Sequence, residues 1–154
     1  MAALVVRAAT VDDVPTIVEF NIRLAAETEG LALDRETLQQ GVAAVLSDQA
    51  RGSYYVACQG ETVVGQIMHT REWSDWRNGD IWWIQSVYVD QAYRRRGVFR
   101  ALYSFVRARA YAAPGVVGLR LYVEEDNETA RETYHELGMD QASYLMMQEL
   151  FADP

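Results

Sequence analysis

The 154-residue sequence contains no lysine and a single cysteine, Cys58. One cysteine cannot form an internal disulfide, so nothing in the chain predicts an oxidising compartment. No apolar run approaches the ~18 residues that a membrane-spanning helix needs. The first nine residues also lack the apolar core of a secretory signal. We therefore expect a cytoplasmic protein with no membrane partner.

Positive charge is scarce, because 14 arginines stand against 22 acidic residues and the net charge is -8. Binding along a nucleic-acid backbone needs positive charge over a broad surface, so this balance argues against a nucleic-acid partner. Half of the residues are hydrophobic, which is enough for a packed core. The length suits one domain, and we expect a single domain over residues 1–154.

Apolar residues follow two different periods along the chain. Helical spacing follows Asp12, Asp34 and Gly97 and recurs over residues 128–137. Strand-like runs cover residues 5–8, 53–58, 62–70, 81–89, 116–123 and 143–150. The resulting order, β-α-α-β-β-β-α-β-α-β, predicts an α/β fold with a mixed, partly antiparallel sheet and helices on its faces. Three consecutive strands exclude the doubly wound dinucleotide folds.

The arginines are concentrated in one stretch. Six lie within residues 94–109, and four of these flank Gly97 between a predicted strand and a predicted helix: Arg94, Arg95, Arg96 and Arg100. A helix N-terminus favours anions, glycine lets the backbone approach a ligand, and guanidinium groups bind phosphate oxygens in pairs. The stretch therefore indicates a diphosphate site, although a solvated basic turn would look the same. It is not a P-loop, which requires a lysine.

A second pattern follows the predicted strand over residues 116–123. Asn127 is a good N-cap for a helix. Ala130 and Tyr134 are spaced to share one face of that helix, and Gly138 suits the position after its last turn. Taken alone, Tyr134 would be expected to be a core aromatic.

Together the two patterns resemble signature elements of the GNAT superfamily of acyl-CoA-dependent N-acyltransferases. The elements are Q/R-x-x-G-x-G/A at a strand-to-helix junction and N-x-x-A-x-x-x-Y-x-x-x-G-F further along. The matching residues are Arg94 and Gly97 in the first element, and Asn127, Ala130, Tyr134 and Gly138 in the second. Phe99 and Met139 depart from the usual small residue and phenylalanine. The resemblance implies a GNAT-like fold over nearly the whole chain.

The resemblance also implies acetyl-CoA as cosubstrate and no metal. Backbone N–H groups from about Arg95 to Arg100 would hold the diphosphate of coenzyme A. The preceding strand, at Val87 and Val89, would pair with the pantetheine arm through main-chain hydrogen bonds. The cofactor-binding residues expected from the resemblance are Val87, Val89, Arg94, Arg95, Arg96, Gly97, Val98, Phe99, Arg100, Asn127 and Tyr134.

The implied reaction is transfer of an acetyl group to a primary amine of a small molecule or of an amino terminus. By resemblance, the N–H of Val87 would stabilise the oxyanion, and Tyr134 would protonate the leaving thiolate as general acid. Many family members carry a glutamate on the central strand where this chain has Gln85, and an amide cannot act as a base. The base is left open among three carboxylates acting through water: Glu27, Glu72 and Glu124.

The sequence patterns that point to a binding site for the acceptor amine are less specific than those for the cosubstrate. Trp73 and Trp76 adjoin a polar loop and are expected to be exposed. With Glu27, Glu29 or Glu72 they could form an aromatic, acidic pocket for a cationic amine. The segment 27–33, between the first two helices, often lines the acceptor site in the family. The candidate substrate-binding residues are Glu27, Trp73 and Gln85.

Two other classes of function stay open. A non-catalytic acyl-CoA sensor would keep the phosphate site, and a protein-interaction module would use the arginine turn to bind acidic partners. A homodimer is also compatible with the sequence, because the predicted strand over residues 143–150 could pair across an interface or fill the core. Neither His69 nor His135 is assigned a role.

Overall fold

The computed structural model describes residues 2–152. The chain groups into two compact units, one ending at Leu121 and the other beginning at Tyr122, and each is described by itself. The single domain expected over residues 1–154 stays a prediction.

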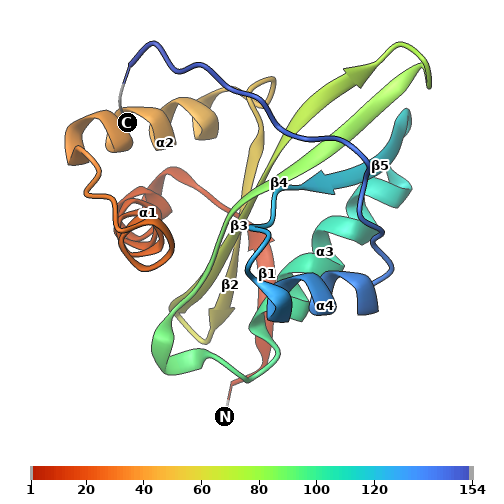
Figure 1. Cartoon of the computed structure of the whole chain (residues 1–154). Helices are drawn as coiled ribbons and strands as arrows, with labels where there is room; N and C mark the ends of the chain where they lie inside the picture. Colours follow the sequence, from red (N-terminus) through yellow and green to blue (C-terminus); the bar gives the residue numbers. More distant parts are fainter. Residues whose placement is uncertain (1, 153–154) are drawn as a thin grey trace. The chain divides into compact units, whose positions relative to one another are not determined.

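The first unit is built on a five-stranded sheet with the order β1-β2-β3-β4-β5 (Figure 1). Strands β1 to β4 are antiparallel neighbours, whereas β5 runs parallel to β4. The strands are β1 (Leu4–Ala8), β2 (Ser53–Gln59), β3 (Thr62–Ser74), β4 (Gly79–Val89) and β5 (Val116–Leu121). The predicted mixed, partly antiparallel sheet is confirmed.

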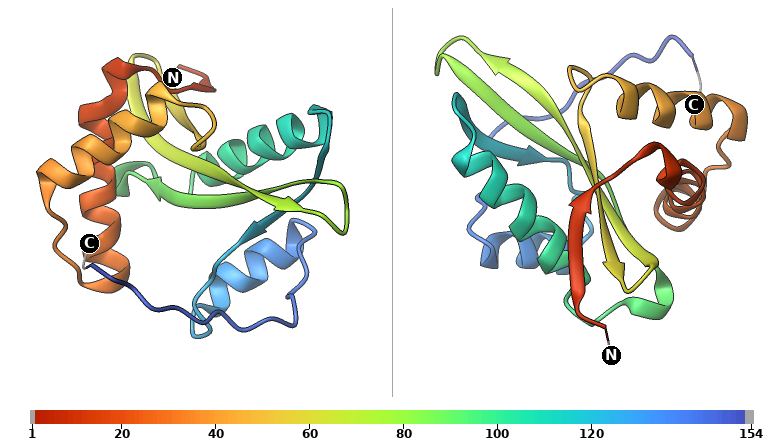
Figure 2. Two further views of the ribbon diagram at one scale, coloured as in Figure 1. Left: turned by 90° about the horizontal axis from the view of Figure 1, so that it is seen from above. Right: turned by 180° about the vertical axis from the view of Figure 1, so that it is seen from behind.

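Helices cover both faces of this sheet (Figure 2). Helices α1 (Val14–Glu29) and α2 (Arg35–Ser47) lie on one face, and α3 (Val98–Ala112) lies on the other. Short 3-10 turns, η1 (Val11–Asp13) and η2 (Gln91–Tyr93), precede α1 and follow β4. Fully or largely buried residues of α1, α2, β2 and β3 form a common core cluster: Ile17, Val18, Val42, Tyr54, Val56, Cys58 and Met68.

Local signals in the sequence mark where these helices begin and end. The Asp34 carboxylate accepts the Thr37 N–H at 2.9 Å and caps α2. Gly30 ends α1 with a φ of 63°, in the left-handed region that glycine enters without steric cost. Cys58 is a buried free thiol, as a small apolar residue within a strand would be.

The second unit contains helix α4 (Glu128–Glu136). The Asn127 side chain accepts the Ala130 N–H at 3.1 Å, so the predicted N-cap is confirmed. The strand predicted over residues 143–150 is wrong, because those residues adopt neither helix nor strand (Figure 1). A strand is stable only when its N–H and C=O groups pair with a neighbour, and alternating apolar residues do not by themselves supply one. Tyr144, Leu145 and Met147 are accordingly exposed.

No helix within residues 2–152 has the length and apolar character required to cross a lipid bilayer.

Candidate active site

The second half of strand β4 is not paired with β5. The register between β4 and β5 runs from Asp80 to Ile84 and stops there, although β4 continues to Val89. On the other side, β4 gains one residue relative to β3, since Gln66 faces Tyr88 whereas Met68 faces Gln85. This is a β-bulge. Among the described residues, no strand pairs with β4 beyond Ile84 on the β5 side.

The bulge lies at Ser86, whose φ of 50° is unusual for a residue other than glycine. After it, the Asp90 N–H donates to the Val64 carbonyl oxygen at 2.9 Å. Successive main-chain groups of a strand point in opposite directions, so the N–H and C=O of Val89 point away from β3 to the open side. An extended ligand that carries amide groups could pair with this edge like an added strand.

A buried chain of amides supports the bulge from within the core. Gln66 Nε2 donates to the Ser86 carbonyl oxygen at 3.0 Å and to Asn21 Oδ1 at 3.2 Å. Asn21 in turn donates to the Tyr54 hydroxyl at 3.1 Å. Gln66 is 0% exposed and Asn21 is 6% exposed. Neither residue was predicted from the sequence, although a glutamine inside an apolar strand is a signal, because a buried amide needs hydrogen-bond partners.

We expect Gln66→Leu to destabilise the protein and to lower any activity that depends on the bulge. Leucine keeps the volume but leaves the Asn21 amide and the Ser86 carbonyl without this partner, at a cost of about 1–3 kcal/mol. Urea unfolding would measure the loss. Gln40→Leu on the exposed side of α2 is the control, and equal midpoints for the two variants would contradict the role given to Gln66.

Two glycines set the position of the N-terminus of α3. A Cβ atom at Gly65 of β3 would lie 2.9 Å from Val98 Cγ1, so only glycine lets the first turn of α3 pack this closely on the sheet. Gly97 is the N-cap residue of α3, with a φ of 80° and no side-chain cap. No atom among the described residues of the first unit lies within 4 Å of a Cβ built there. Within the first unit, the N-cap position of α3 is therefore uncrowded on the side of its Cβ.

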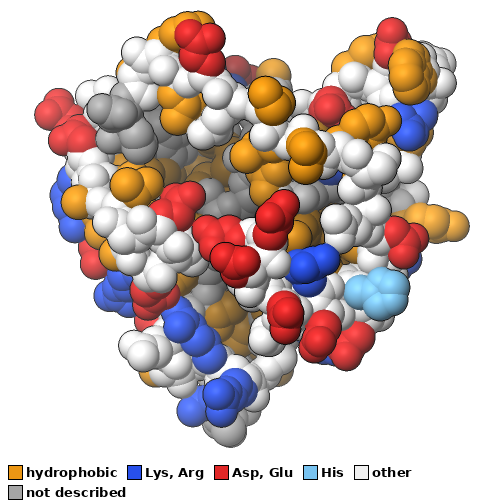
Figure 3. Space-filling view, in the orientation of Figure 1, with side chains coloured by type: hydrophobic (Ala, Val, Ile, Leu, Met, Phe, Trp, Pro, Cys, Tyr) orange, Lys and Arg blue, Asp and Glu red, His pale blue; other side chains and the backbone are white. Residues whose placement is uncertain are grey.

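Arginine side chains gather over the loop between β4 and α3, at the lower end of the face in Figure 3. The guanidinium of Arg96 lies 5.5 Å from the centre of the Tyr93 ring. Arg95 takes a left-handed backbone conformation, with a φ of 65°. The Phe99 ring packs along α3 against Tyr103, with 6.0 Å between ring centres. Phenylalanine at this position thus leaves the space at Gly97 open.

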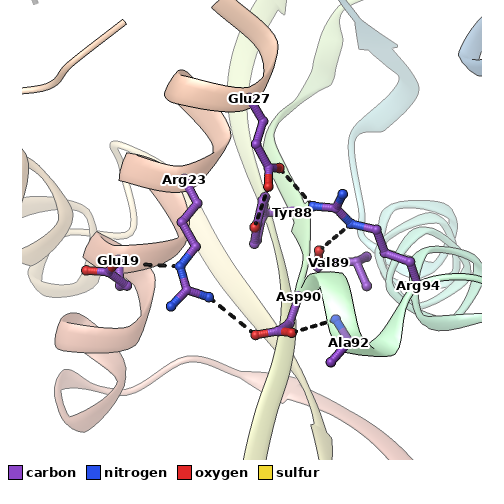
Figure 4. Close-up of polar contacts among 8 residues, drawn as sticks. All are labelled: Glu19, Arg23, Glu27, Tyr88, Val89, Asp90, Ala92 and Arg94. Atoms are coloured by element: carbon purple, nitrogen blue, oxygen red, sulfur yellow. Dashed lines mark hydrogen bonds and ion pairs between the residues drawn. The ribbon is translucent and has the colours of Figure 1, made fainter. Parts of the chain in front are cut away.

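The structure brings Glu27 of α1 and Arg94 into contact, although the sequence predicted them for different ligands (Figure 4). Arg94 Nη2 lies 2.8 Å from Glu27 Oε2, and Arg94 Nε donates to the Val89 carbonyl oxygen at 3.0 Å. The Tyr88 hydroxyl donates to Glu27 Oε1 at 3.2 Å. Burial, together with the Glu27 charge, raises the pKa of Tyr88, so this hydroxyl keeps its proton at neutral pH. One contact cluster therefore links α1 to the exposed carbonyl of β4.

The other two substrate candidates lie apart from this cluster. Gln85 Nε2 donates to the Thr70 hydroxyl at 2.6 Å, in the middle of β4. Trp73 and Trp76 are 61% and 87% exposed, as predicted. Trp73 pairs with Asp80 at the far end of β4, which places it about 26 Å along the strand from Tyr88 at ~3.3 Å per residue. The structure thus does not bring Trp73 together with Glu27.

The other predicted residues lie on the sheet or in the second unit. Glu72 of β3 forms an ion pair with Arg120 of β5. In the second unit, Asn127 is the N-cap residue of α4, and Ala130 and the partly buried Tyr134 lie within that helix. No group of three or more His, Cys, Asp or Glu side chains suited to a metal ion is found in the described part of the chain.

Comparisons with known proteins agree with this arrangement. The model of the acetyltransferase (GNAT) family matches residues 18–139. A solved structure described as "a possible acetyltransferase" from Clostridium difficile 630 is 45% identical, covers 97% of this chain and 99% of its own, and superposes with a TM-score of 0.91. An integron cassette protein from the mobile metagenome of Cole Harbour Salt Marsh, 22% identical over 97% of this chain and 91% of its own, shares the fold with a TM-score of 0.84.

The family model covers well over half of the chain, so the chain belongs to the GNAT family of acetyltransferases. No curated protein sequence matches it.

Proposed function

We propose that the protein transfers an acetyl group from acetyl-CoA to a primary amine of a small molecule or of an amino terminus. The observation that carries this proposal is the open edge of β4 beside the uncapped N-terminus of α3. Acetyl-CoA would supply the acetyl group as a thioester. Its diphosphate suits a helix N-terminus flanked by arginines, and its amide-containing arm suits a strand edge.

The residues present fit this cosubstrate. Gly97 leaves the space around its own Cβ position open, and the backbone from Arg95 leads through this N-cap residue into the first turn of α3, which begins at Val98. Val89 turns its N–H and C=O to the open side of β4, and Val87 follows the strained residue of the bulge. In this proposal Val87 N–H donates to the acetyl carbonyl oxygen, and Tyr134 gives a proton to the departing sulfur. The role of Tyr134 rests on its match to the family motif.

For the acceptor we propose Glu27 as the residue that binds the amine. Its carboxylate lies beside the carbonyl edge of β4 and carries negative charge that suits an ammonium group. Arg94 bonds both to this carboxylate and to the Val89 carbonyl, so it would have to move when the cosubstrate pairs with that edge. Release of Arg94 toward the diphosphate would then leave Glu27 available for the amine.

Thiol release tests the proposal directly. The protein is incubated with acetyl-CoA and a panel of primary amines, and free coenzyme A thiol is measured over time. Release that depends on the amine supports the enzyme. Stabilisation by acetyl-CoA without any turnover supports the sensor, a reading favoured by the amide of Gln85, which bonds to Thr70 where a base would be expected. If acetyl-CoA neither stabilises the protein nor is consumed, both proposals fail.

Glu27→Gln tests the acceptor assignment. We expect the KM for the amine to rise roughly tenfold, equivalent to the loss of one charged contact. Affinity for acetyl-CoA should stay the same or improve, since Arg94 loses its ionic partner. Glu19→Gln is the matched control, because Glu19 also lies on α1 and pairs with arginines but is remote from Tyr88 (Figure 4). An unchanged KM for every amine that is acetylated would remove Glu27 from the acceptor site.

A further inference from the structure

We propose that the first unit carries a second ligand site, a cavity beneath the C-terminal end of α3 that binds a small organic carboxylate with an apolar body. The cavity has a volume of about 490 Å³, within the range of small-molecule pockets. It is formed by the ends of β1, α2 and α3 and by the first half of β2 and the middle of the β3–β4 hairpin.

Positive charge at this cavity is not balanced by the protein. Arg71 and Arg109 both line it. Within residues 2–152, neither guanidinium forms an ion pair with a carboxylate. Arg71 donates to the Gln49 carbonyl oxygen, and Arg109 lies over the rings of Tyr55 and Phe105 at 5.5 and 5.4 Å. Both arginines are exposed, and two guanidinium groups at one cavity in a chain of net charge -8 favour an anion such as a carboxylate, which accepts charge-assisted hydrogen bonds from guanidinium donors.

The wall behind the arginines is aromatic and polar. His69 is 0% exposed and stacks on Trp82 with 3.7 Å between ring centres. Its Nε2 lies 3.1 Å from the Tyr55 hydroxyl, whereas its Nδ1 and Trp82 Nε1 have no hydrogen-bond partner among the described residues. Buried polar atoms without partners are rare in native proteins. Burial, Arg71 and Arg109 lower the pKa of His69 to about 4, so the imidazole is neutral at pH 7 and the cavity's charge is that of the arginines.

The rest of the lining sets the shape of the ligand. It consists mainly of small or aliphatic residues, namely Ala8, Ala9, Val45, Leu46, Ala112 and Ala113. These side chains offer no hydrogen bond to the part of a ligand that lies against them. An inorganic anion would leave this surface uncovered, whereas a carboxylate with a ring or a short alkyl chain would cover it.

The cavity is separate from the proposed acetyl-transfer site. Trp82 lies in the part of β4 that pairs with β5, before the bulge at Ser86. Val87, Val89 and Gly97 do not line the cavity. The inference therefore stands or falls independently of the proposed function.

Benzoate is the probe, and the indole N–H resonance of Trp82 is the readout in a two-dimensional NMR titration, assigned with Trp82→Phe. We expect saturable shifts with a dissociation constant on the order of 1 mM. Arg71→Met and Arg109→Met should each weaken binding at least tenfold, because each removes a charge-assisted contact. Arg107→Met, which changes an exposed arginine of the same helix outside the cavity, is the matched control and should bind as the wild type does.

Three further ligands, tested in the same titration, show whether the site selects an organic carboxylate. Benzamide, which has the same shape without the charge, should bind at least tenfold more weakly than benzoate, and so should inorganic phosphate. Coenzyme A should not displace benzoate. The inference is overturned if benzoate does not bind, if it binds the Arg71→Met and Arg109→Met variants as tightly as the wild type, if benzamide or phosphate binds equally well, or if coenzyme A competes.

Discussion

Replacing Gly97 with glutamate is expected to abolish binding of acetyl-CoA, with a loss of affinity of at least about 100-fold, equivalent to roughly 2.8 kcal/mol. The physical reason is that the side chain would project into the open space in front of α3 and bring a negative charge to the place where we propose the diphosphate binds. The introduced carboxylate and the diphosphate are both negative, so they would repel each other at this helix N-terminus. Calorimetric titration with acetyl-CoA measures the effect.

The structure supplies a control for backbone strain. Gly115 has a φ of 79°, against 80° at Gly97, and it also has no described neighbour in the first unit within 4 Å of a Cβ position. Gly115→Glu therefore imposes the same left-handed conformation and the same charge at the other end of α3. It should lose similar stability and keep its affinity for acetyl-CoA. Wild-type affinity in Gly97→Glu, or an equal loss in both variants, would refute the assignment of the diphosphate site.

Replacing Tyr134 with phenylalanine is expected to lower kcat by about 100-fold or more, the usual contribution of a positioned general acid. The KM for acetyl-CoA should change less than about twofold, because the ring is retained and the hydroxyl would act mainly as the thiolate leaves. Steady-state kinetics with an amine found in the thiol-release panel, over a range of pH, measures both quantities.

Tyr144→Phe is the matched control in the same unit, because Tyr144 is 74% exposed and lies outside the family motif. It should retain wild-type kcat. Unchanged turnover in Tyr134→Phe would remove that residue from the catalytic role without touching the diphosphate site. A loss of acetyl-CoA affinity with unchanged kcat would instead make Tyr134 a binding residue.

These two experiments separate the enzyme from the sensor. A sensor should lose acetyl-CoA binding in the Gly97→Glu variant. Because a sensor has no turnover, Tyr134→Phe should leave its acetyl-CoA binding unchanged and have no activity to lower. An enzyme should respond to both variants in different kinetic constants. The amine acceptor can then be sought with Glu27→Gln as a filter, because true acceptors should depend on that carboxylate more than incidental ones do.

Most elements of the fold were predicted from the sequence because their signals are local. Asp34 caps α2 through Thr37, and Asn127 caps α4 through Ala130, each across three residues. Gly30 and Gly97 lie at helix boundaries and adopt left-handed conformations, which glycine enters without steric cost. Such contacts depend on neighbours in the chain and cost little loop-closure entropy, so the residue pattern alone predicts them.

The final strand shows where this reasoning fails. Residues 143–150 have the apolar pattern of a strand and yet adopt no regular structure. The pattern indicates which side chains would share a face. It does not indicate which neighbouring strand would accept the backbone hydrogen bonds, and strand stability depends on that neighbour.

The candidate site also has a part that the local sequence predicts and a part that depends on distant contacts. The sequence by itself determined the segment where we propose that the diphosphate binds, because strand, arginines, glycine and helix follow one another directly over residues 81–112. Only the tertiary structure decided the rest. The bulge at Ser86 depends on Gln66 and on Asn21, which is 45 residues from Gln66, and the contact between Glu27 and Arg94 spans 67 residues. Such contacts exist only after the chain has closed these long loops and packed α1 on β4, and no local spacing encodes which distant side chains will then meet.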